Sequence, residues 1–268
     1  MDPLVEAGAA VGKELITKTS FYDDGLKPVV KEAGKALGTL GKTVNMCLSP
    51  LAGIVWGYET VCKYVEKRVT EKLQSTPTEQ IQTPKANIAV PVIEGIRTVS
   101  DQPDLQELYA NLLASAMNKA TASGVLPAFA TAISELSSDE AKILCVLSRK
   151  IVIPIVDLIE RAPDNQGFKT VLTNFTDIAL VAKCEYPNMT APYLENLERL
   201  KLIEIRRDIH LTNDQVYQTL QNHPILQHFI HKMNDPSKKD FYKGVVRLTS
   251  YGITFCKACN IQLLDLPG

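Results

Sequence analysis

The stretch APYLENLERLKLIEIRR, residues 191–207, changes from a helical to a strand-like pattern within a few residues. Its first part, APYLENLERLK, predicts a helix that Thr190 caps through its hydroxyl. Its second part, LIEIRR at 202–207, alternates apolar and polar residues as a half-buried strand does. A second strand-like stretch, GVVRLT at 244–249, is expected to pair with it. These elements decide the fold of the C-terminal half.

Further helices on either side complete the pattern. Ser137 and Glu140 form a capping box that opens the helix SDEAKILCVLSR. A second helix is expected near Asn174–Cys184, and Ser250 caps a last helix, YGITFCKACN. Three helices, a strand, a returning strand and a closing helix resemble a winged helix-turn-helix domain with a small β wing.

This winged-helix-like domain is predicted to span residues 131–268. It carries an insertion at 210–240 between the two wing strands, which is longer than an ordinary wing and predicts two short helices divided at Pro224. The whole chain is expected to be mainly α.

The winged fold suggests DNA binding through its third helix, but charge argues against this use. That helix carries two acids, Glu195 and Glu198, against two bases, Arg199 and Lys201. The chain has 29 Lys and Arg against 30 Asp and Glu, and no region is strongly basic. Because DNA binding depends on several contacts between cations and phosphates, nucleic acid is disfavoured as a partner. A winged-helix transcriptional regulator remains an alternative.

An N-terminal helical hairpin is predicted over residues 1–74. Ser49 and Pro50 give a helix start, a hydroxyl N-cap followed by proline at the first helical position. The uncharged stretch at 43–58, TVNMCLSPLAGIVWGY, is shorter than the ~20 apolar residues that a membrane-spanning helix needs. It is interpreted as a hairpin core around Trp56. A conditionally membrane-active hairpin, making membrane contact through residues 43–58, is the alternative.

A polar stretch, STPTEQIQTP at 75–84, predicts a linker, and residues 85–130 are expected to form central helices. In the central part, Asp104, Glu107 and Asn111 fall on one face of a helix that starts near Pro103. The helix dipole explains the acids in the first turn. A metal-dependent hydrolase that uses the two carboxylates is a further alternative.

Two blocks, SPLAGIVWGYE at 49–59 and DLQELYANLLASAMN at 104–118, resemble the abortive-infection alpha (Abi-alpha) family of bacterial anti-phage proteins. The matching residues are Pro50, Trp56, Gly57, Tyr58, Asp104, Glu107, Leu108, Tyr109, Asn111 and Leu112. The resemblance implies a role in phage resistance and carries no catalytic residues with it.

Cysteine and histidine provide the residue types of a zinc site in Cys256-x-x-Cys259 and His228-x-x-His231. The cysteines lie in a stretch with one apolar helical face, so core cysteines and surface histidines are the preferred interpretation. The chain shows none of the common catalytic motifs, neither a nucleophile elbow nor a phosphate-binding loop nor HExxH. It is therefore expected not to be an enzyme and to use no metal or cofactor.

We therefore expect a cytoplasmic abortive-infection factor, peripheral to the membrane when activated, that acts through protein contacts or self-association. The chain lacks a signal-peptide pattern at its start. The hairpin is expected to serve as the effector or oligomerisation element, with Trp56, Gly57 and Tyr58 as its working face. Asp104, Glu107 and Asn111 are the candidate contact surface on the central helix.

Overall fold

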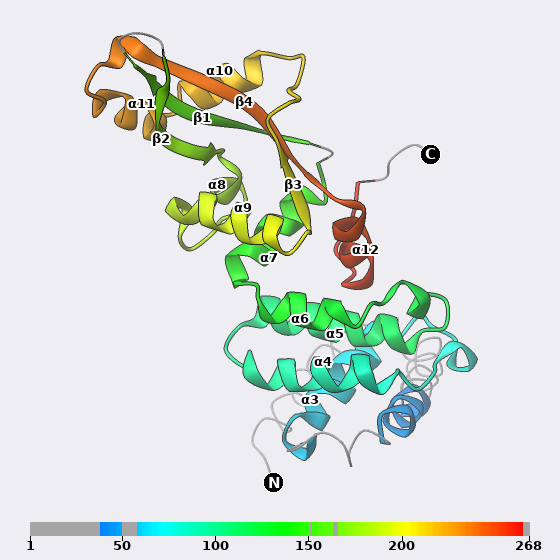
Figure 1. Ribbon diagram of the computed structural model, residues 1–268. Coiled ribbons are helices and arrows are strands. Elements are labelled where there is room, and N and C mark those ends of the chain that lie inside the picture. Colours follow the sequence, from blue (N-terminus) through cyan, green and yellow to red (C-terminus); the bar gives the residue numbers. More distant parts are fainter. Residues whose placement is uncertain (1–37, 50–57, 151, 163–165, 265–268) are drawn as a thin grey trace, which may run out of the picture.

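The computed structural model describes residues 38–49, 58–150, 152–162 and 166–264, and it is mainly helical (Figure 1). After a helical stretch at 38–48, the helices are α3 (Tyr58–Lys72), α4 (Ala86–Thr98), α5 (Pro103–Met117), α6 (Ala128–Ser134), α7 (Ser138–Leu147), α8 (Ile178–Val181), α9 (Thr190–Arg199), α10 (Gln215–Gln221), α11 (Pro224–His231) and α12 (Ser250–Ala258). The strands are β1 (Ile153–Arg161), β2 (Phe168–Phe175), β3 (Ile203–Arg206) and β4 (Lys239–Leu248). Short 3₁₀ turns are η2 (Thr78–Gln80), η3 (Ala122–Gly124), η4 (Pro187–Met189) and η5 (Pro236–Lys238).

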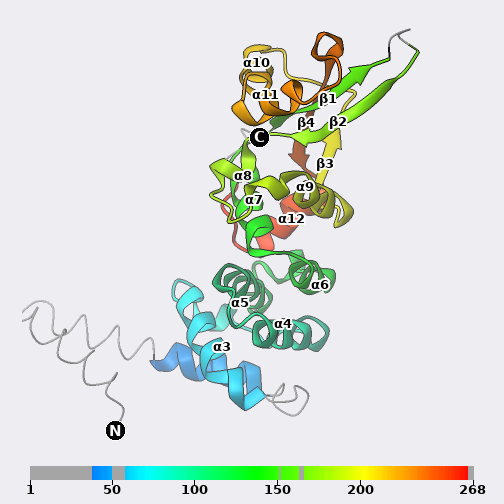
Figure 2. The same ribbon diagram turned by 90° about the vertical axis from the view of Figure 1, so that its left-hand side faces the viewer.

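The elements are stacked in three tiers (Figure 1, Figure 2). Helices α3 to α6 form one end, α7, α8, α9 and α12 the middle, and the sheet with α10 and α11 the other end. Aromatic packing joins the first two tiers, because Phe129 of α6 makes edge-on contacts with Tyr251 and Phe255 of α12, at 5.2 and 5.4 Å between ring centroids. The main hydrophobic core runs continuously through these two tiers.

The N-terminal helices pack on this core. Val44 and Leu48, from the helical stretch at 38–48, are fully buried together with Val65 and Val69 of α3. In the described part of the uncharged stretch, Val44, Cys47 and Leu48 are thus packed against protein, whereas Asn45, Met46 and Ser49 are exposed. Trp56, Gly57 and Pro50 lie outside the described residues, and Tyr58 is the first residue of α3.

Helix α5 confirms the prediction of a start near Pro103, which occupies its first turn. The predicted linker at 75–84 runs along the far end of this helix. Ile81 is buried and forms an isolated antiparallel bridge with Asn118, and the Gln82 amide donates to the Met117 carbonyl at 2.8 Å. Backbone hydrogen bonds therefore tie this polar stretch to α5.

The capping box at the start of α7 is confirmed. The Ser137 hydroxyl accepts from the Glu140 amide at 3.2 Å, and the Glu140 carboxylate accepts from the Ser137 amide at 2.7 Å. Two other predicted caps were wrong. Thr190 lies inside α9 and donates to the Pro187 carbonyl instead, while Thr249 rather than Ser250 caps α12 by accepting from the Gly252 amide.

The sheet is larger than the predicted small β wing. Its strand order is β2-β1-β4-β3 with antiparallel neighbours. The predicted pairing of LIEIRR with GVVRLT is confirmed, with Ile203 opposite Leu248. Strands β1 and β2 were not predicted. IPIVDLIER of β1 is buried on both faces and shows no clear alternation.

The predicted extent of the helix near Asn174–Cys184 was wrong. Residues as far as Phe175 belong to β2, and α8 covers only Ile178–Val181. Asn174 sits at the strand end with a left-handed backbone, φ 53°, a conformation that asparagine tolerates better than most residues. Local pattern therefore placed the helix several residues too early.

The insertion contains the two predicted short helices, α10 and α11, and Pro224 opens the second. Both lie on one face of the sheet (Figure 2). They enclose a second hydrophobic core with strands β1 and β2, formed by Val156, Leu158, Phe175, Tyr217, Leu220, Leu226, Ile230 and Met233. The insertion is therefore a covering layer that buries one side of the enlarged sheet.

Candidate functional site: the α5 groove

A groove of about 550 Å³ lies between α5, α7, the end of α8 and the segment that follows α12. We call it the α5 groove. Its lining residues are Asp104, Glu107, Leu108, Asn111, Ala141, Lys142, Cys145, Val146, Arg149, Val181, Ala182, Lys183, Cys259, Asn260, Ile261 and Gln262. The three residues predicted as a contact surface, Asp104, Glu107 and Asn111, thus lie in one concave site.

Glu107 links α5 to α3. Its carboxylate accepts from both Arg68 and Lys72, and Arg68 also pairs with Glu71 at 2.7 Å. Partial burial opposes ionisation, but the two cationic donors outweigh it and lower the pKa of Glu107. Glu107 is therefore a charged tie between two helices at the groove wall.

Asn111 lies about one turn beyond Glu107 on α5 and is only 8% exposed. Within the described residues its side chain has no hydrogen-bond partner. Asn111 is not among the described side chains with a buried, unpartnered polar atom, so its amide reaches the surface of the groove, where its donors and acceptor are free to bind something else. Asp104 is exposed at the start of the same helix.

The wall of the α5 groove opposite α5 carries basic side chains. Lys142 of α7 donates to Asp139 at 3.1 Å. Arg149, just after α7, and Lys183, just after α8, are exposed and form no ion pair within the part of the chain that the structure describes. The wall opposite α5 therefore presents two free positive charges to solvent.

Asp139 holds this wall together, and the sequence did not single it out. Its carboxylate accepts from the amides of Glu185 at 2.9 Å and Tyr186 at 3.0 Å, and from the Tyr193 hydroxyl at 3.0 Å. Burial opposes ionisation, but these donors together with Lys142 outweigh it and lower the pKa of Asp139. Its position in the first turn of α7 signals only a helix-dipole acid, since Glu185, Tyr186 and Tyr193 lie 46 to 54 residues away in sequence.

Thiols in and behind the groove are poor nucleophiles. Burial raises the pKa of Cys145 and Cys259, which line it, and raises the pKa of Cys256 to about 12. Cys256 and Cys259 belong to the main core, whereas His228 and His231 lie on α11 over the second core. Among the described residues, no group of three or more His, Cys, Asp or Glu side chains is arranged to hold a metal.

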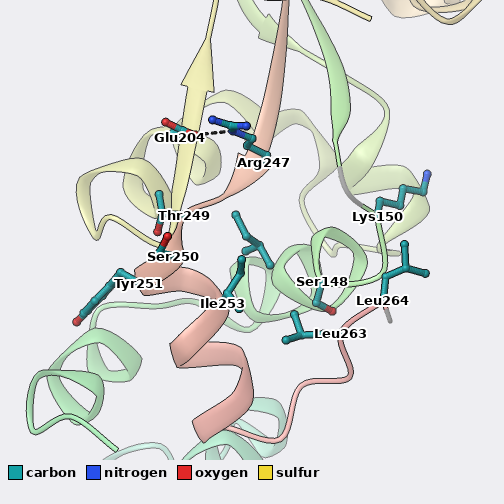
Figure 3. A pocket seen from close by; sticks show the side chains of 11 residues that line it. Ser148, Lys150, Glu204, Arg247, Thr249, Ser250, Tyr251, Ile253, Leu263 and Leu264 are labelled. Atoms are coloured by element: carbon teal, nitrogen blue, oxygen red, sulfur yellow. Dashed lines mark hydrogen bonds and ion pairs between the residues drawn. The ribbon is translucent and has the colours of Figure 1, made fainter. Parts of the chain in front are cut away.

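A second pocket, of about 650 Å³, lies between the end of α7, strands β3 and β4, and the start of α12 (Figure 3). Figure 3 shows the ion pair of Arg247 with Glu204 at one end and Ser148, Leu263 and Leu264 at the other. The Ser148 hydroxyl donates to the Gln262 carbonyl at 2.8 Å and so fixes the segment between the two cavities. The pocket contains none of the candidate site residues that the sequence predicted.

The polar side chains of α9 are used within the molecule. Asn196 donates to Glu140 at 2.7 Å, Arg199 pairs with Glu135 at 2.5 Å, and the Glu198 carboxylate accepts from the Ile205 amide at 2.9 Å. Glu195 remains exposed on the helix surface. The helix that would enter a DNA groove thus presents a carboxylate and an already paired arginine.

No helix within the described ranges combines the length and the apolar character that crossing a membrane requires. The described residues of the stretch at 43–58 include one strongly exposed apolar side chain, Met46, beside the buried Val44, Cys47 and Leu48.

These features define a mainly helical protein with a C-terminal four-stranded sheet and a charged groove on its central helix. The family model for abortive infection alpha matches residues 57–259. The chain therefore belongs to the abortive infection alpha family, as the block at 104–118 led us to expect. The match begins at Gly57, so most of the first block lies outside it. Membership suggests a role in abortive infection.

Other comparisons add little. No curated protein matches the chain. One solved structure, of an uncharacterized protein from the hydrocarbon-degrading marine bacterium Alcanivorax borkumensis SK2, is similar with 15% identity and a TM-score of 0.36. The similarity covers 53% of this chain and 96% of that one.

Proposed function

We propose that this protein is an anti-phage abortive-infection factor that acts through protein–protein contacts. The observation that carries the proposal is the family match over residues 57–259. The structure offers a suitable contact surface in the α5 groove, where Asp104, Glu107 and Asn111 lie together.

We further propose that α7, α8 and α9 with strands β1, β4 and β3 form a winged helix-turn-helix used as a scaffold. The order of these elements along the chain and the central place of β4 between β1 and β3 support this interpretation. Strand β2 and helices α10 and α11 would then be additions to the fold. A fold of this type is used for many functions, so the site rather than the fold must decide between them.

DNA binding is the second candidate, and the surface of α9 counts against it. Arg199 is paired and Glu195 is exposed, while duplex DNA requires several free cations. Electrophoretic mobility shifts of duplex DNA in a salt series distinguish the two functions. A complex that weakens steeply with added salt would support the regulator instead.

The N-terminal hairpin is proposed as the effector or oligomerisation element, with residues 43–58 as its uncharged centre. The burial of Val44 and Leu48 supports a hairpin that is packed in the resting protein. Leakage of dye from liposomes made with anionic lipid, measured with the full chain and with a Trp56→Ala variant, tests membrane activity. Equal leakage with and without protein would remove the membrane alternative.

The decisive experiment is a phage-plating assay. Cells that express the intact chain are compared with cells carrying an empty vector and with cells expressing Trp56→Ala. We expect the intact chain to lower the efficiency of plating of at least one phage in a broad panel, and Trp56→Ala to restore it. Equal plating on all three strains across the panel would contradict the abortive-infection proposal.

A further inference from the structure

We propose that the α5 groove binds a short acidic peptide segment of a partner protein, with Asn111 pairing to the peptide backbone. This inference rests on the proposed function, because it names the class of partner behind the protein contacts. Three features of the groove support it: the Asn111 amide that lines it without a hydrogen bond to the rest of the described chain, the apolar walls, and the two cations without an ion pair among the described residues.

The first feature is Asn111 itself. A side-chain amide offers one carbonyl acceptor and two N–H donors, and a peptide group in an extended segment offers the complementary acceptor and donor. Asn111 lines the groove, is 8% exposed and has no side-chain partner within the described ranges. A bound backbone would pair with this amide, which has no hydrogen bond to the rest of the described chain and reaches the groove surface.

The walls are the second feature. Leu108, Val146 and Ile261 contribute apolar surface beside Asn111, and Val181 at the rim is 48% exposed. The volume of about 550 Å³ lies within the range of pockets that enclose a ligand of ~300–1,000 Å³. That space suits a few residues of an extended segment with small apolar side chains, and it is too small for a nucleic acid duplex.

The charged side chains of the groove determine which net charge the bound segment should carry. Arg149 and Lys183 form no ion pair within the described part of the chain, whereas Glu107 is neutralised by Arg68 and Lys72. Asp104 is the remaining acid at the rim without an ion pair among the described residues. The free charges are therefore two cations against one anion, and the cations lie on the wall that faces α5. Carboxylates of the ligand would pair with Arg149 and Lys183 while its backbone lies over Asn111.

The test uses the purified full chain and three pools of fluorescent hexapeptides. Each pool alternates a small apolar residue with one charged or polar residue, Glu, Lys or Gln. Fluorescence anisotropy should show binding of the Glu pool, weaker binding of the Gln pool and none of the Lys pool, and added salt should weaken binding of the Glu pool. Equal binding of the Glu and Lys pools, or no binding of any pool, would overturn the proposal.

Variants separate binding from folding. Asn111→Leu is close to isosteric and removes an amide that no hydrogen bond within the described chain holds, so it should weaken binding of the Glu pool about tenfold while the melting temperature stays equal or rises. Arg149→Glu should weaken the same pool by a similar factor, and Lys232→Glu, an exposed cation at the end of α11, should leave it unchanged. A large drop in melting temperature for Asn111→Leu would show that the amide has a structural partner and would overturn the proposal.

Phage plating distinguishes failure of this inference from failure of the proposed function. If the intact chain and Asn111→Leu protect cells equally, the groove has no part in protection, whereas the abortive-infection role stands. If the Glu pool binds but the intact chain protects against no phage, the groove site stands and the abortive-infection proposal fails.

Discussion

Gly95 of α4 lies directly against the ring of Tyr109 of α5: a methyl group at Gly95 would come within 2.3 Å of the Tyr109 Cζ atom. Tyr109 is fully buried, and its hydroxyl donates to the Ala130 carbonyl at 3.3 Å. The ring therefore cannot swing away without breaking the contact between α5 and α6. This pair fixes how closely α4 approaches α5, the helix that forms one wall of the α5 groove.

Replacing this glycine by alanine should therefore destabilise the protein. We expect Gly95→Ala to lower the free energy of unfolding by ~1–3 kcal/mol, the usual cost of overpacking a core, even though alanine favours a helix more than glycine does. Thermal unfolding followed by circular dichroism measures the change. Gly124→Ala is the matched control, since no atom lies within 4 Å of its added methyl group. Equal melting temperatures for the two variants would contradict the contact.

Asp139 should make the free energy of unfolding depend on pH in the acid range. Its folded-state pKa is lowered, so its contribution is full above the unfolded pKa of about 3.9 and is lost as the pH falls through the folded value. We expect Asp139→Asn to lower the free energy of unfolding at pH 7 by ~1–3 kcal/mol, because a charged acceptor of several hydrogen bonds is replaced by a neutral one.

Urea unfolding at pH 7 and at pH 4 to 3 measures both effects. The difference between wild type and Asp139→Asn should shrink toward the acid end. The exposed Asp101→Asn serves as the control and should show the wild-type dependence. A gap between wild type and Asp139→Asn that widens in acid would reverse the sign that we derive.

Glu107 should contribute little to stability despite its two partners. Its side chain is 42% exposed in the ion pairs with Arg68 and Lys72, and exposed ion pairs contribute at most ~1 kcal/mol. We expect Glu107→Gln to lower the free energy of unfolding by no more than this. The difference from wild type should shrink in 1 M salt, where the Debye screening length is about 3 Å. Glu94→Gln, exposed on α4, is the control. A loss of several kcal/mol would mean that Glu107 has a structural role beyond these pairs.

Tyr217 should hold the insertion on the sheet. Its hydroxyl donates to the Gly244 carbonyl at 3.0 Å and accepts from the Leu211 amide at 2.9 Å. Tyr217→Phe removes both hydrogen bonds from a fully buried hydroxyl position, so the free energy of unfolding should fall by ~1–3 kcal/mol. Hydrogen exchange of the Leu211 amide should speed up as well. Tyr242→Phe, whose ring is partly exposed, should change neither quantity.

Local signals in the sequence predicted the elements whose stabilising contacts are themselves local. The capping box of Ser137 and Glu140 and the proline start of α5 satisfy backbone groups within a single helical turn. The pairing of β3 with β4 followed from alternating residues on both strands. The helices α10 and α11 were predicted from the break at Pro224.

The sequence predicted the candidate site only in part. Helical spacing places Asp104, Glu107 and Asn111 on one face, but it does not indicate that Glu107 is paired or that Asn111 is free. The sequence offered no sign of Arg149 and Lys183 on the facing wall, because they reach the groove from α7 and α8. Asp139 was missed for the same reason.

By itself the sequence determined a mainly helical chain, the family to which it belongs and the helix that carries the three polar residues. Tertiary structure alone decided the four-stranded sheet, the covering of that sheet by α10 and α11, and the groove opposite α5. The physical reason is that β1 is buried on both faces and therefore has no periodicity to read. The groove exists only where α5, α7, α8 and the segment after α12 meet in space.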